Sequence, residues 1–249
     1  MNLFYSSEIN PDTIHFVLPE EESLHCIRVL RMKKGDKLFL SDGKGMFYEC
    51  IVEVDHPKKC QLKVVRSIAD QAKRNFHLTI AIAPTKNIDR FEWFLEKAAE
   101  IGCDVIIPMQ CRHSERSVIK TERLVKVLVS AMKQCLKSQL PVLRELISFK
   151  EFIESHKNFS GQKFIGHIPE LSETEFPPER PQGKLLSHAI QLKPSHVLIA
   201  IGPEGGFSED EIGGALKNDF IPISLGNSRL RVETAGIVAC SVANSILFG

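Results

Sequence analysis

The pattern of hydrophobic and polar positions changes near residue 70. Before that point, three short runs rich in β-branched and aromatic residues, at 37–41, 47–54 and 61–68, predict strands. Asp42-Gly43-Lys44-Gly45 predicts a turn after the first run. Strands this short and this closely spaced indicate a small barrel or sandwich.

After residue 75, apolar strands alternate with helices. The predicted strands cover residues 77–83, 105–108, 163–168, 197–201 and 221–225. The predicted helices cover residues 89–101, 121–137, 208–217 and 232–247. Because strands that alternate with helices form parallel sheets, we expect an α/β domain over 73–249 that follows a β domain over 1–72. Residues 170–183, rich in proline and glycine, are expected to form a surface loop.

Capping residues mark the ends of two of these helices. Asp89 is placed to cap the start of the helix at 89–101, and Gly102 to end it. Ser208 followed by Glu211 forms a capping box for the helix at 208–217. The final helix is apolar nearly all round, so it must be buried on most faces. It is either a central helix of this chain or part of a subunit interface.

The composition of the 249 residues is that of a soluble globular protein, with 43% hydrophobic and 25% charged residues. No apolar run approaches the roughly 18 residues of a membrane span, and the start does not resemble a secretory signal, so we expect a cytoplasmic protein. The seven cysteines form no Cys-x-x-Cys pair, and His-Glu-x-x-His is absent. We therefore expect free thiols and no metal.

The charge is nearly balanced, with 32 Lys and Arg against 31 Asp and Glu. A nucleic-acid surface would therefore have to be a local patch. Residues 112–137 carry seven basic residues against two acidic ones, and residues 28–34 form a second basic cluster. Such clusters are the electrostatic footprint of phosphate binding, although most charge runs are only solvated faces.

The segment Gly202-Pro203-Glu204-Gly205-Gly206-Phe207 joins an apolar strand to a helix. Ligands of open α/β sheets bind at the carboxyl ends of the strands, which is where this segment begins. Its glycines would let the backbone approach a ligand closely. The segment lacks both Gly-x-x-x-x-Gly-Lys-Ser/Thr and Gly-x-Gly-x-x-Gly, so a common nucleotide site is not indicated. The alternative is a tight turn that binds nothing.

A second strand-to-helix segment, at 225–235, concentrates chemically useful side chains. Arg229 and Arg231 can clamp a phosphate, and Glu233 or Thr234 can accept or relay a proton. The alternative is that Glu233 and Thr234 cap the last helix and that Arg231 forms a salt bridge.

Three motifs together resemble the SPOUT methyltransferases, and among them the 16S rRNA uridine-N3 methyltransferase (RsmE) family. They are Arg90-x-x-x-x-x-x-Lys97-Ala98-x-Glu100-Ile101-Gly102, the segment 201–207, and Leu225-Gly226 through Arg231-x-Glu233-Thr234-Ala235. In the β domain, His25-x-x-Arg28-Val29-Leu30-Arg31, Gly35-Asp36 and Asp42-Gly43 are similar to the same family. The resemblance runs nearly from end to end.

This resemblance implies an N-terminal PUA-like RNA-binding β-barrel and a SPOUT-type parallel sheet whose C-terminal part forms a trefoil knot. It implies a homodimer and S-adenosylmethionine held near residues 166–170, 202–206 and 225–230. The implied cofactor-binding residues are Gly166, Gly202, Pro203, Glu204, Gly205, Gly206, Leu225, Gly226 and Leu230.

The implied partner is 16S rRNA in the small ribosomal subunit. The candidate RNA-binding residues are Arg28, Arg31, Lys33, Arg112 and Arg116. Uracil N3 is a poor nucleophile until it loses its proton. We therefore expect Arg231 or Arg229 to stabilise the charged uracil oxygen, and Glu233 or Thr234 to handle the proton or orient the base.

Two other functions fit the same motifs. One is a SPOUT enzyme that methylates another RNA nucleotide, because fold does not fix function. The other is a non-catalytic RNA-binding ribosome-assembly factor. A small-molecule hydrolase is disfavoured because Gly-x-Ser-x-Gly is absent.

Overall fold

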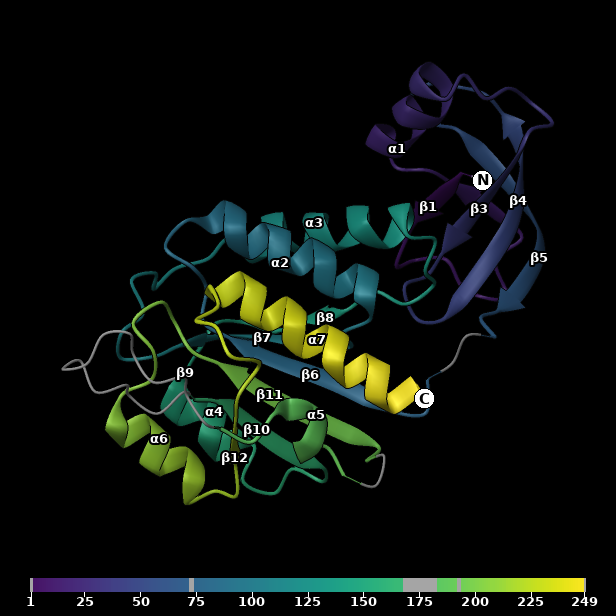
Figure 1. Cartoon of the computed structure of the whole chain (residues 1–249). Coiled ribbons are helices and arrows are strands. Elements are labelled where there is room, and N and C mark those ends of the chain that lie inside the picture. The colour runs from purple at the N-terminus through teal and green to yellow at the C-terminus, as the bar shows by residue number, and fades with distance from the viewer. Residues whose placement is uncertain (1, 72–73, 168–182, 192–193, 249) are drawn as a thin grey trace. The chain divides into compact units, whose positions relative to one another are not determined.

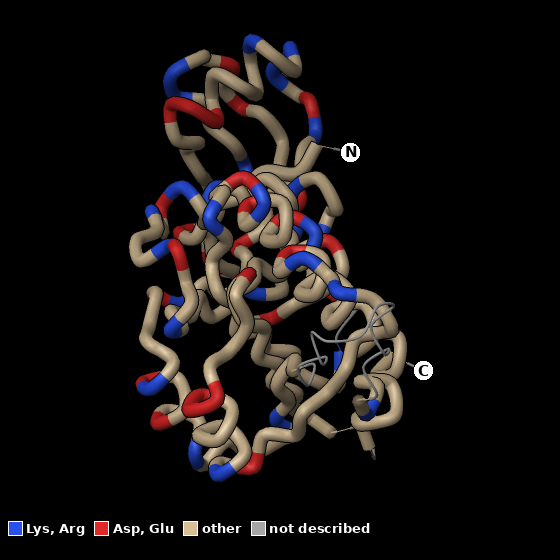
Figure 2. The backbone as a smooth tube through the Cα atoms, turned by 60° about the vertical axis from the view of Figure 1, so that its left-hand side comes forward, with Lys and Arg blue, Asp and Glu red and all other residues tan. Residues whose placement is uncertain are grey.

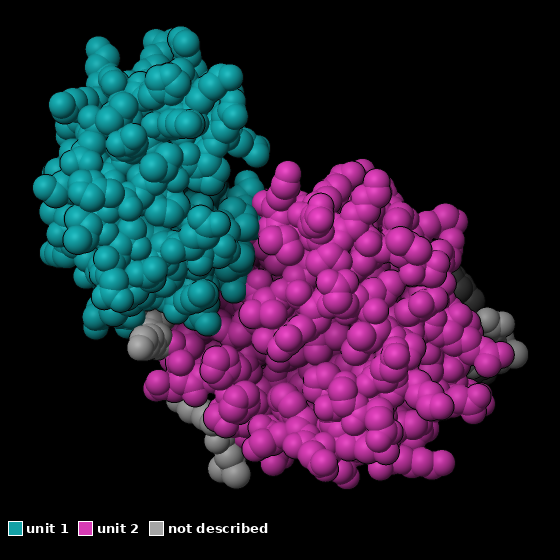
Figure 3. All heavy atoms as spheres, turned by 180° about the vertical axis from the view of Figure 1, so that it is seen from behind, with its two compact units in different colours: residues 1–73, 129–140 teal, residues 74–128, 141–249 magenta. Residues whose placement is uncertain are grey.

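The computed structural model describes residues 2–71, 74–167, 183–191 and 194–248. The chain divides into two compact units (Figure 3). The first combines residues 1–73 with 129–140, and the second combines 74–128 with 141–249. Segment 129–140 is held in the first unit by long-range bonds: Lys133 pairs with Glu22 at 2.6 Å, and the Ser41 hydroxyl donates to the Ser138 carbonyl at 2.9 Å.

The first unit is built on a five-stranded sheet. Its order is β1 (Leu3–Tyr5), β3 (Lys37–Ser41), β4 (Met46–Val54), β5 (Gln61–Ala69) and β2 (His15–Val17). The three predicted strands are confirmed as β3, β4 and β5. The edge strands β1 and β2, three residues each, are additional, as are α1 (Glu20–Leu24) and the π-helix η1 (His25–Val29). Phe4, Leu38 and Tyr48 are among the side chains buried in its core.

The second unit is built on a parallel sheet. Its order is β12 (Ile221–Ile223), β10 (Gln162–Gly166), β11 (His196–Ile201), β6 (His77–Ile82), β7 (Val105–Gln110) and β8 (Val142–Leu143), while β9 (Ile147–Ser148) also pairs with β7. All its pairings are parallel. The predicted parallel α/β sheet is therefore confirmed.

Helices cover both faces of this sheet (Figure 1). They are α2 (Ile88–Ile101), α4 (Phe149–Ser155), α5 (Leu186–Ala189), α6 (Glu209–Leu216) and α7 (Val232–Phe248), while α3 (Thr121–Gln134) begins in the second unit and ends in the first. Helices α2 and α7 lie side by side on one face, and α4 and α6 lie on the other. Since both faces are buried, strands such as β11 consist almost wholly of apolar residues.

Helix capping follows the sequence signals with one exception. Gly102 ends α2 with a left-handed φ of 118°, and the Ser208–Glu211 box caps α6, as predicted. The predicted cap of α2, Asp89, is wrong. Asn87 is the N-cap, and its side chain accepts a hydrogen bond from the Asp89 amide. An Asx cap accepts from an amide two or three residues later, so Asn87 competes for the same position.

The predicted ends of several elements differ from the observed ones. The strands predicted to end at residues 168 and 225 end at Gly166 and Ile223. The helix predicted over 121–137 ends at Gln134, before Leu136 adopts a positive φ of 57°. Position 168 and almost all of the predicted loop at 170–183 lie outside the described residues.

The face that α7 turns to α2 and the sheet carries small residues. Gly236, Ala239 and Ala243 are buried there. A methyl group on Gly236 would lie 2.6 Å from the Phe94 ring and 2.9 Å from Ile82. The glycine therefore sets how closely the last helix approaches α2 and β6.

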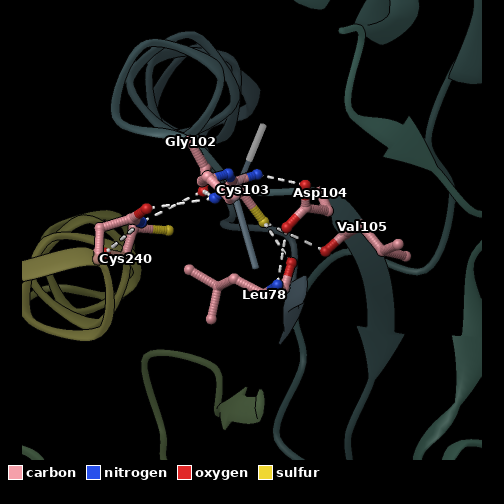
Figure 4. A network of polar contacts seen from close by, with 8 residues as sticks. Leu78, Gly102, Cys103, Asp104, Val105 and Cys240 are labelled. Atoms are coloured by element: carbon pink, nitrogen blue, oxygen red, sulfur yellow. Dashed lines mark hydrogen bonds and ion pairs between the residues drawn. The ribbon is translucent and has the colours of Figure 1, made fainter. Parts of the chain in front are cut away.

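A buried polar network ties the end of α7 to the amino-terminal end of the sheet (Figure 4). The Arg74 guanidinium pairs with Asp104 and donates to the Gly102 carbonyl and the Asn244 side chain. The second Asp104 oxygen accepts the Leu78 amide at 2.7 Å. Buried charges are tolerated when they are paired and fully hydrogen-bonded, as here.

No helix in the described part of the chain combines the length and the apolarity needed to cross a membrane. All seven cysteines lie in the described part of the chain, where none forms a disulfide and six are buried.

Gly236→Ala should lower the free energy of unfolding by about 1–3 kcal/mol, because the added methyl group overpacks the contact with Phe94 and Ile82. Gly213→Ala in α6 is the matched control, since a side chain there meets nothing within 4 Å. This control should raise stability by roughly 0.5–1 kcal/mol. Urea unfolding of both variants checks the pair, and equal effects would contradict the packing argument.

Candidate functional site

Four neighbouring strands of the second unit end at the same level. Gly166, the last residue of β10, is in register with Ile201 of β11 and with Ile223 of β12. Ile201 is in register with Ile82 of β6. The loops that follow these strands therefore begin along one edge of the sheet, which is where open parallel sheets bind ligands.

The glycines of the first predicted segment have different roles. A Cβ on Gly202 would lie 3.0 Å from the Phe207 ring, and one on Gly205 would lie 2.9 Å from the His113 Cβ. Gly206 has a positive φ of 74° and meets nothing within 4 Å. Gly202 and Gly205 therefore make room for other side chains, and Gly206 alone of the three borders open space.

The second predicted segment contains a similar open glycine. Gly226 has a φ of 140°, and nothing lies within 4 Å of the position of its Cβ. Its amide donates to the Ser224 hydroxyl at 3.2 Å, which in turn donates to the Gly226 carbonyl at 2.9 Å. The half-buried Leu225 and Leu230 flank the loop. Two loops that follow the strands on either side of β10 thus each contribute a glycine open to solvent or ligand.

The four candidate catalytic side chains differ in their surroundings. Arg229 and Arg231 are exposed, and neither guanidinium bonds to a described residue. Glu233, only 8% exposed, lies 3.9 Å from Nε of Arg90. Thr234 is half-buried, and its hydroxyl bonds to no residue within the described ranges. Within the described residues the two arginines have no partner that would compete with a ligand, whereas Glu233 is paired with Arg90.

Two further loops hold the glycine segment in place. The sequence analysis did not single out the loop after β6, and it named Arg116 in the loop after β7 only as a candidate RNA contact. In the loop after β6, the Lys86 amide donates to Glu204 at 3.0 Å. In the loop after β7, Nε and Nη2 of Arg116 donate to the Thr85 and Lys86 carbonyls at 3.0 and 2.6 Å. Their position directly after strands of the same sheet was the available sequence signal.

Glu211 connects the start of α6 to the loop after β7. One carboxylate oxygen accepts the Ser208 amide at 2.8 Å and completes the capping box. The other oxygen accepts the Arg112 amide at 2.8 Å. A single carboxylate therefore caps the helix and fixes the neighbouring loop.

The candidate RNA-binding residues occupy both units. Arg28, Arg31 and Lys33 are exposed in the first unit, where Arg31 has a positive φ of 56° after the π-helix. Arg112 is exposed and Arg116 is half-buried in the second unit. Figure 2 shows basic and acidic positions interspersed along the chain.

Part of the basic stretch at 112–137 is neutralised by carboxylates. Arg123 pairs with Glu92 at 2.5 Å, which raises the pKa of Arg123, and Lys133 pairs with Glu22. The Lys86 ammonium pairs with Glu115 at 2.6 Å, and this hydrogen bond raises the pKa of Lys86. Among the residues whose placement is described, no three His, Cys, Asp or Glu side chains gather as a metal site would require.

Comparisons with known proteins identify relatives along the whole chain. A family model described as an RNA methyltransferase domain matches residues 72–244, and one described as an RNA methyltransferase PUA domain matches residues 18–65. Ribosomal RNA small subunit methyltransferase E of Bacillus subtilis is 26% identical over 236 residues, which cover 91% of this chain and 88% of the relative.

Two solved structures share the fold over almost their full length. A probable rRNA methyltransferase from Porphyromonas gingivalis is 39% identical with a TM-score of 0.83, covering 100% of this chain and 99% of that one. A putative methyltransferase from Legionella pneumophila, solved with bound S-adenosylmethionine, is 26% identical with a TM-score of 0.83, covering 98% and 96%.

Glu211→Ala should speed hydrogen exchange at the Arg112 amide and cost about 1 kcal/mol beyond the loss of the helix cap. Glu151→Ala is the matched control, because Glu151 forms the same capping box with Ser148 at the start of α4. It should leave exchange at Arg112 unchanged. Urea unfolding and amide exchange measure both effects, and equal exchange in the two variants would contradict the link to Arg112.

Proposed function

The chain belongs to the RNA methyltransferase family, and we propose that it methylates N3 of a specific uridine in 16S ribosomal RNA with S-adenosylmethionine as methyl donor. The observation that carries this proposal is the alignment of β11, β10 and β12, which brings two glycine loops to one edge of the sheet. The names of the curated relatives support the choice of small-subunit RNA.

The residues at this edge fit the cofactor. Gly206 and Gly226 leave open space beside their backbones, and Gly166 lies on the strand between their loops. We propose that the cofactor is held by Gly166, Gly202, Pro203, Glu204, Gly205, Gly206, Leu225, Gly226 and Leu230. When bound, S-adenosylmethionine supplies a methyl group on a positively charged sulfur. The cofactor of the Legionella relative supports this assignment.

The two exposed arginines, Arg229 and Arg231, suit the target base. Uracil that has lost its N3 proton carries negative charge on its carbonyl oxygens, so donors fixed toward those oxygens favour the reactive form. Arg231 and Arg229, which follow the Gly226 loop and bond to no residue that the structure describes, are the candidates to supply them. Holding the nitrogen in line with the methyl group contributes further through orientation.

Glu233 and Thr234 take complementary roles in this proposal. Arg90 lies beside the buried Glu233 carboxylate, which favours Glu233 as the residue that orients the start of α7. The Thr234 hydroxyl has no partner among the described side chains, so it is the candidate to contact the base or relay its proton.

The exposed cations Arg28, Arg31, Lys33 and Arg112 are proposed to contact the RNA backbone. In this proposal residues 1–72 form the RNA-binding domain and residues 73–249 the methyltransferase domain. The small ribosomal subunit as substrate supports a cytoplasmic location.

A homodimer through α7 is part of the same proposal. Its outer side carries the half-exposed Val238, Val242 and Ile246, followed by Phe248, which is 62% exposed. Apolar side chains in this arrangement are suited to a partner helix. The trefoil knot stays a prediction, because residues 168–182, which lead from β10 toward α5, lie outside the described part of the chain.

Arg231→Ala should lower kcat for methyl transfer to small-subunit RNA by about 10²–10³-fold, since it removes a donor to the developing negative charge. Cofactor affinity, measured by calorimetry, should stay within twofold. Arg144→Ala, at an exposed arginine outside the site, is the control and should retain full activity.

Mass spectrometry of the digested RNA identifies the product. The expected product is 3-methyluridine at one position. Methylation of another nucleotide, or no methyl transfer by a protein that binds S-adenosylmethionine, would refute the proposed function. Unchanged turnover of Arg231→Ala would remove Arg231 from the catalytic residues.

The double variant Arg28→Glu and Arg31→Glu should weaken RNA binding and flatten its dependence on salt, because fewer counterions are released. Cofactor affinity should not change. Binding titrations at several salt concentrations measure the slope, and equal RNA affinity before and after the substitutions would exclude these arginines from the RNA contact.

A further inference from the structure

Three loops of the second unit are fastened to one another at the carboxyl edge of the sheet. They are residues 83–87 after β6, residues 111–116 after β7 and residues 202–207 after β11. We infer that Arg116 is a positioning residue for cofactor binding: by holding the loop at 83–87, it presents the Lys86 amide to Glu204 and fixes the glycine segment. This inference rests on the function proposed above.

The Arg116 guanidinium donates hydrogen bonds to two adjacent backbone carbonyls. Its Nε donates to the Thr85 carbonyl at 3.0 Å, and its Nη2 donates to the Lys86 carbonyl at 2.6 Å. Ala83, Pro84 and Thr85 are buried, so carbonyl groups in this loop need protein partners. The rigid guanidinium fork binds two adjacent acceptors in one orientation, which a lysine cannot do.

Lys86 passes this restraint to the glycine segment. Its amide donates to Oε1 of Glu204 at 3.0 Å, and its ammonium pairs with Glu115 at 2.6 Å. Glu115 directly precedes Arg116 in the chain. The loop after β7 therefore contacts Lys86 twice: Arg116 bonds to the Lys86 carbonyl, and Glu115 pairs with the Lys86 ammonium. The Lys86 amide is thereby held toward Glu204.

His113 provides a second connection between the same loops. Its Nδ1 lies 3.3 Å from the Gly206 carbonyl, and its Cβ occupies the space that a side chain on Gly205 would need. The conformation of Gly206, the open glycine of this segment, therefore depends on the loop that carries Arg116.

The two arginines of the loop after β7, Arg112 and Arg116, differ in their hydrogen-bond partners and their exposure. The Arg116 guanidinium is engaged by two backbone carbonyls, whereas that of Arg112 is exposed and bonds to no described residue. Arg112 is thus the one available to a phosphate, and the structure assigns Arg116 to the cofactor side of the site.

The first test uses Arg116→Gln with Arg112→Gln as its matched control. Without cofactor, Arg116→Gln should speed amide exchange at Lys86 and across 202–207 by at least tenfold. The KM for S-adenosylmethionine should rise at least tenfold, with kcat at saturation and the salt dependence of RNA binding unchanged. Arg112→Gln should leave amide exchange and the KM for S-adenosylmethionine unchanged. It should lower the affinity for RNA and reduce the salt slope of RNA binding by about one.

A second pair of variants isolates the Glu204 contact. Glu204→Gln keeps an acceptor for the Lys86 amide, so amide exchange at Lys86 and across 202–207 without cofactor should stay within about threefold of the native protein. Glu204→Ala removes the acceptor and should reproduce the faster exchange of Arg116→Gln. This pair decides the inference even if Arg116→Gln does not fold, which a thermal melt would reveal.

Native exchange in Arg116→Gln together with weaker RNA binding would overturn the inference and make Arg116 a phosphate contact. Identical amide exchange in Glu204→Ala and Glu204→Gln without cofactor would also overturn it. If the native protein bound no S-adenosylmethionine while exchange still rose in Arg116→Gln, the proposed function would fail, and only the restraint that Arg116 places on the glycine segment would stand.

Discussion

The register of the parallel sheet is the constraint on which the site depends. Gly166 lies level with Ile201 on one side and with Ile223 on the other, so the loops after β11 and β12 begin on either side of one strand. Parallel strands run in the same direction, so the loops that follow their carboxyl ends all begin at the same edge of the sheet. Residues more than 20 positions apart in sequence are thereby brought to a common edge.

The opposite edge and the helical layer hold this register in place. Arg74 and Asp104 join the amino-terminal end of the sheet to Asn244 near the end of α7. At the other end of α7, Gly236 lets the helix approach Phe94 and Ile82 closely. Because α7 directly follows the loop with Arg229 and Arg231, its packing also determines where those two arginines begin.

The sequence predicted the parts of the structure that depend on local periodicity. Apolar runs located the long strands, and Gly102 ended α2 as expected. The three-residue strands β1 and β2 are too short for a periodic signal, since their pairing comes from distant partners. The glycine segment was recognised as a whole, but only tertiary contacts separate Gly205, which makes room for His113, from Gly206, which stays open. A count of basic residues over 112–137 could not predict the two hydrogen bonds from Arg116 to the loop after β6 either, because they join segments that are distant in sequence.

The basic residues of the stretch 112–137 divide into cations that are engaged within the protein and cations that have no partner among the described residues. Carboxylates neutralise Arg123 and Lys133, and backbone carbonyls engage Arg116, so the local excess at 112–137 is smaller for a ligand than the sequence count of seven against two. A paired cation must first break its bonds within the protein before it can bind a phosphate, and this costs free energy that an unpaired cation does not lose. The exposed Arg112, which has no partner among the described residues, would lose no such bond in the proposed contact with RNA.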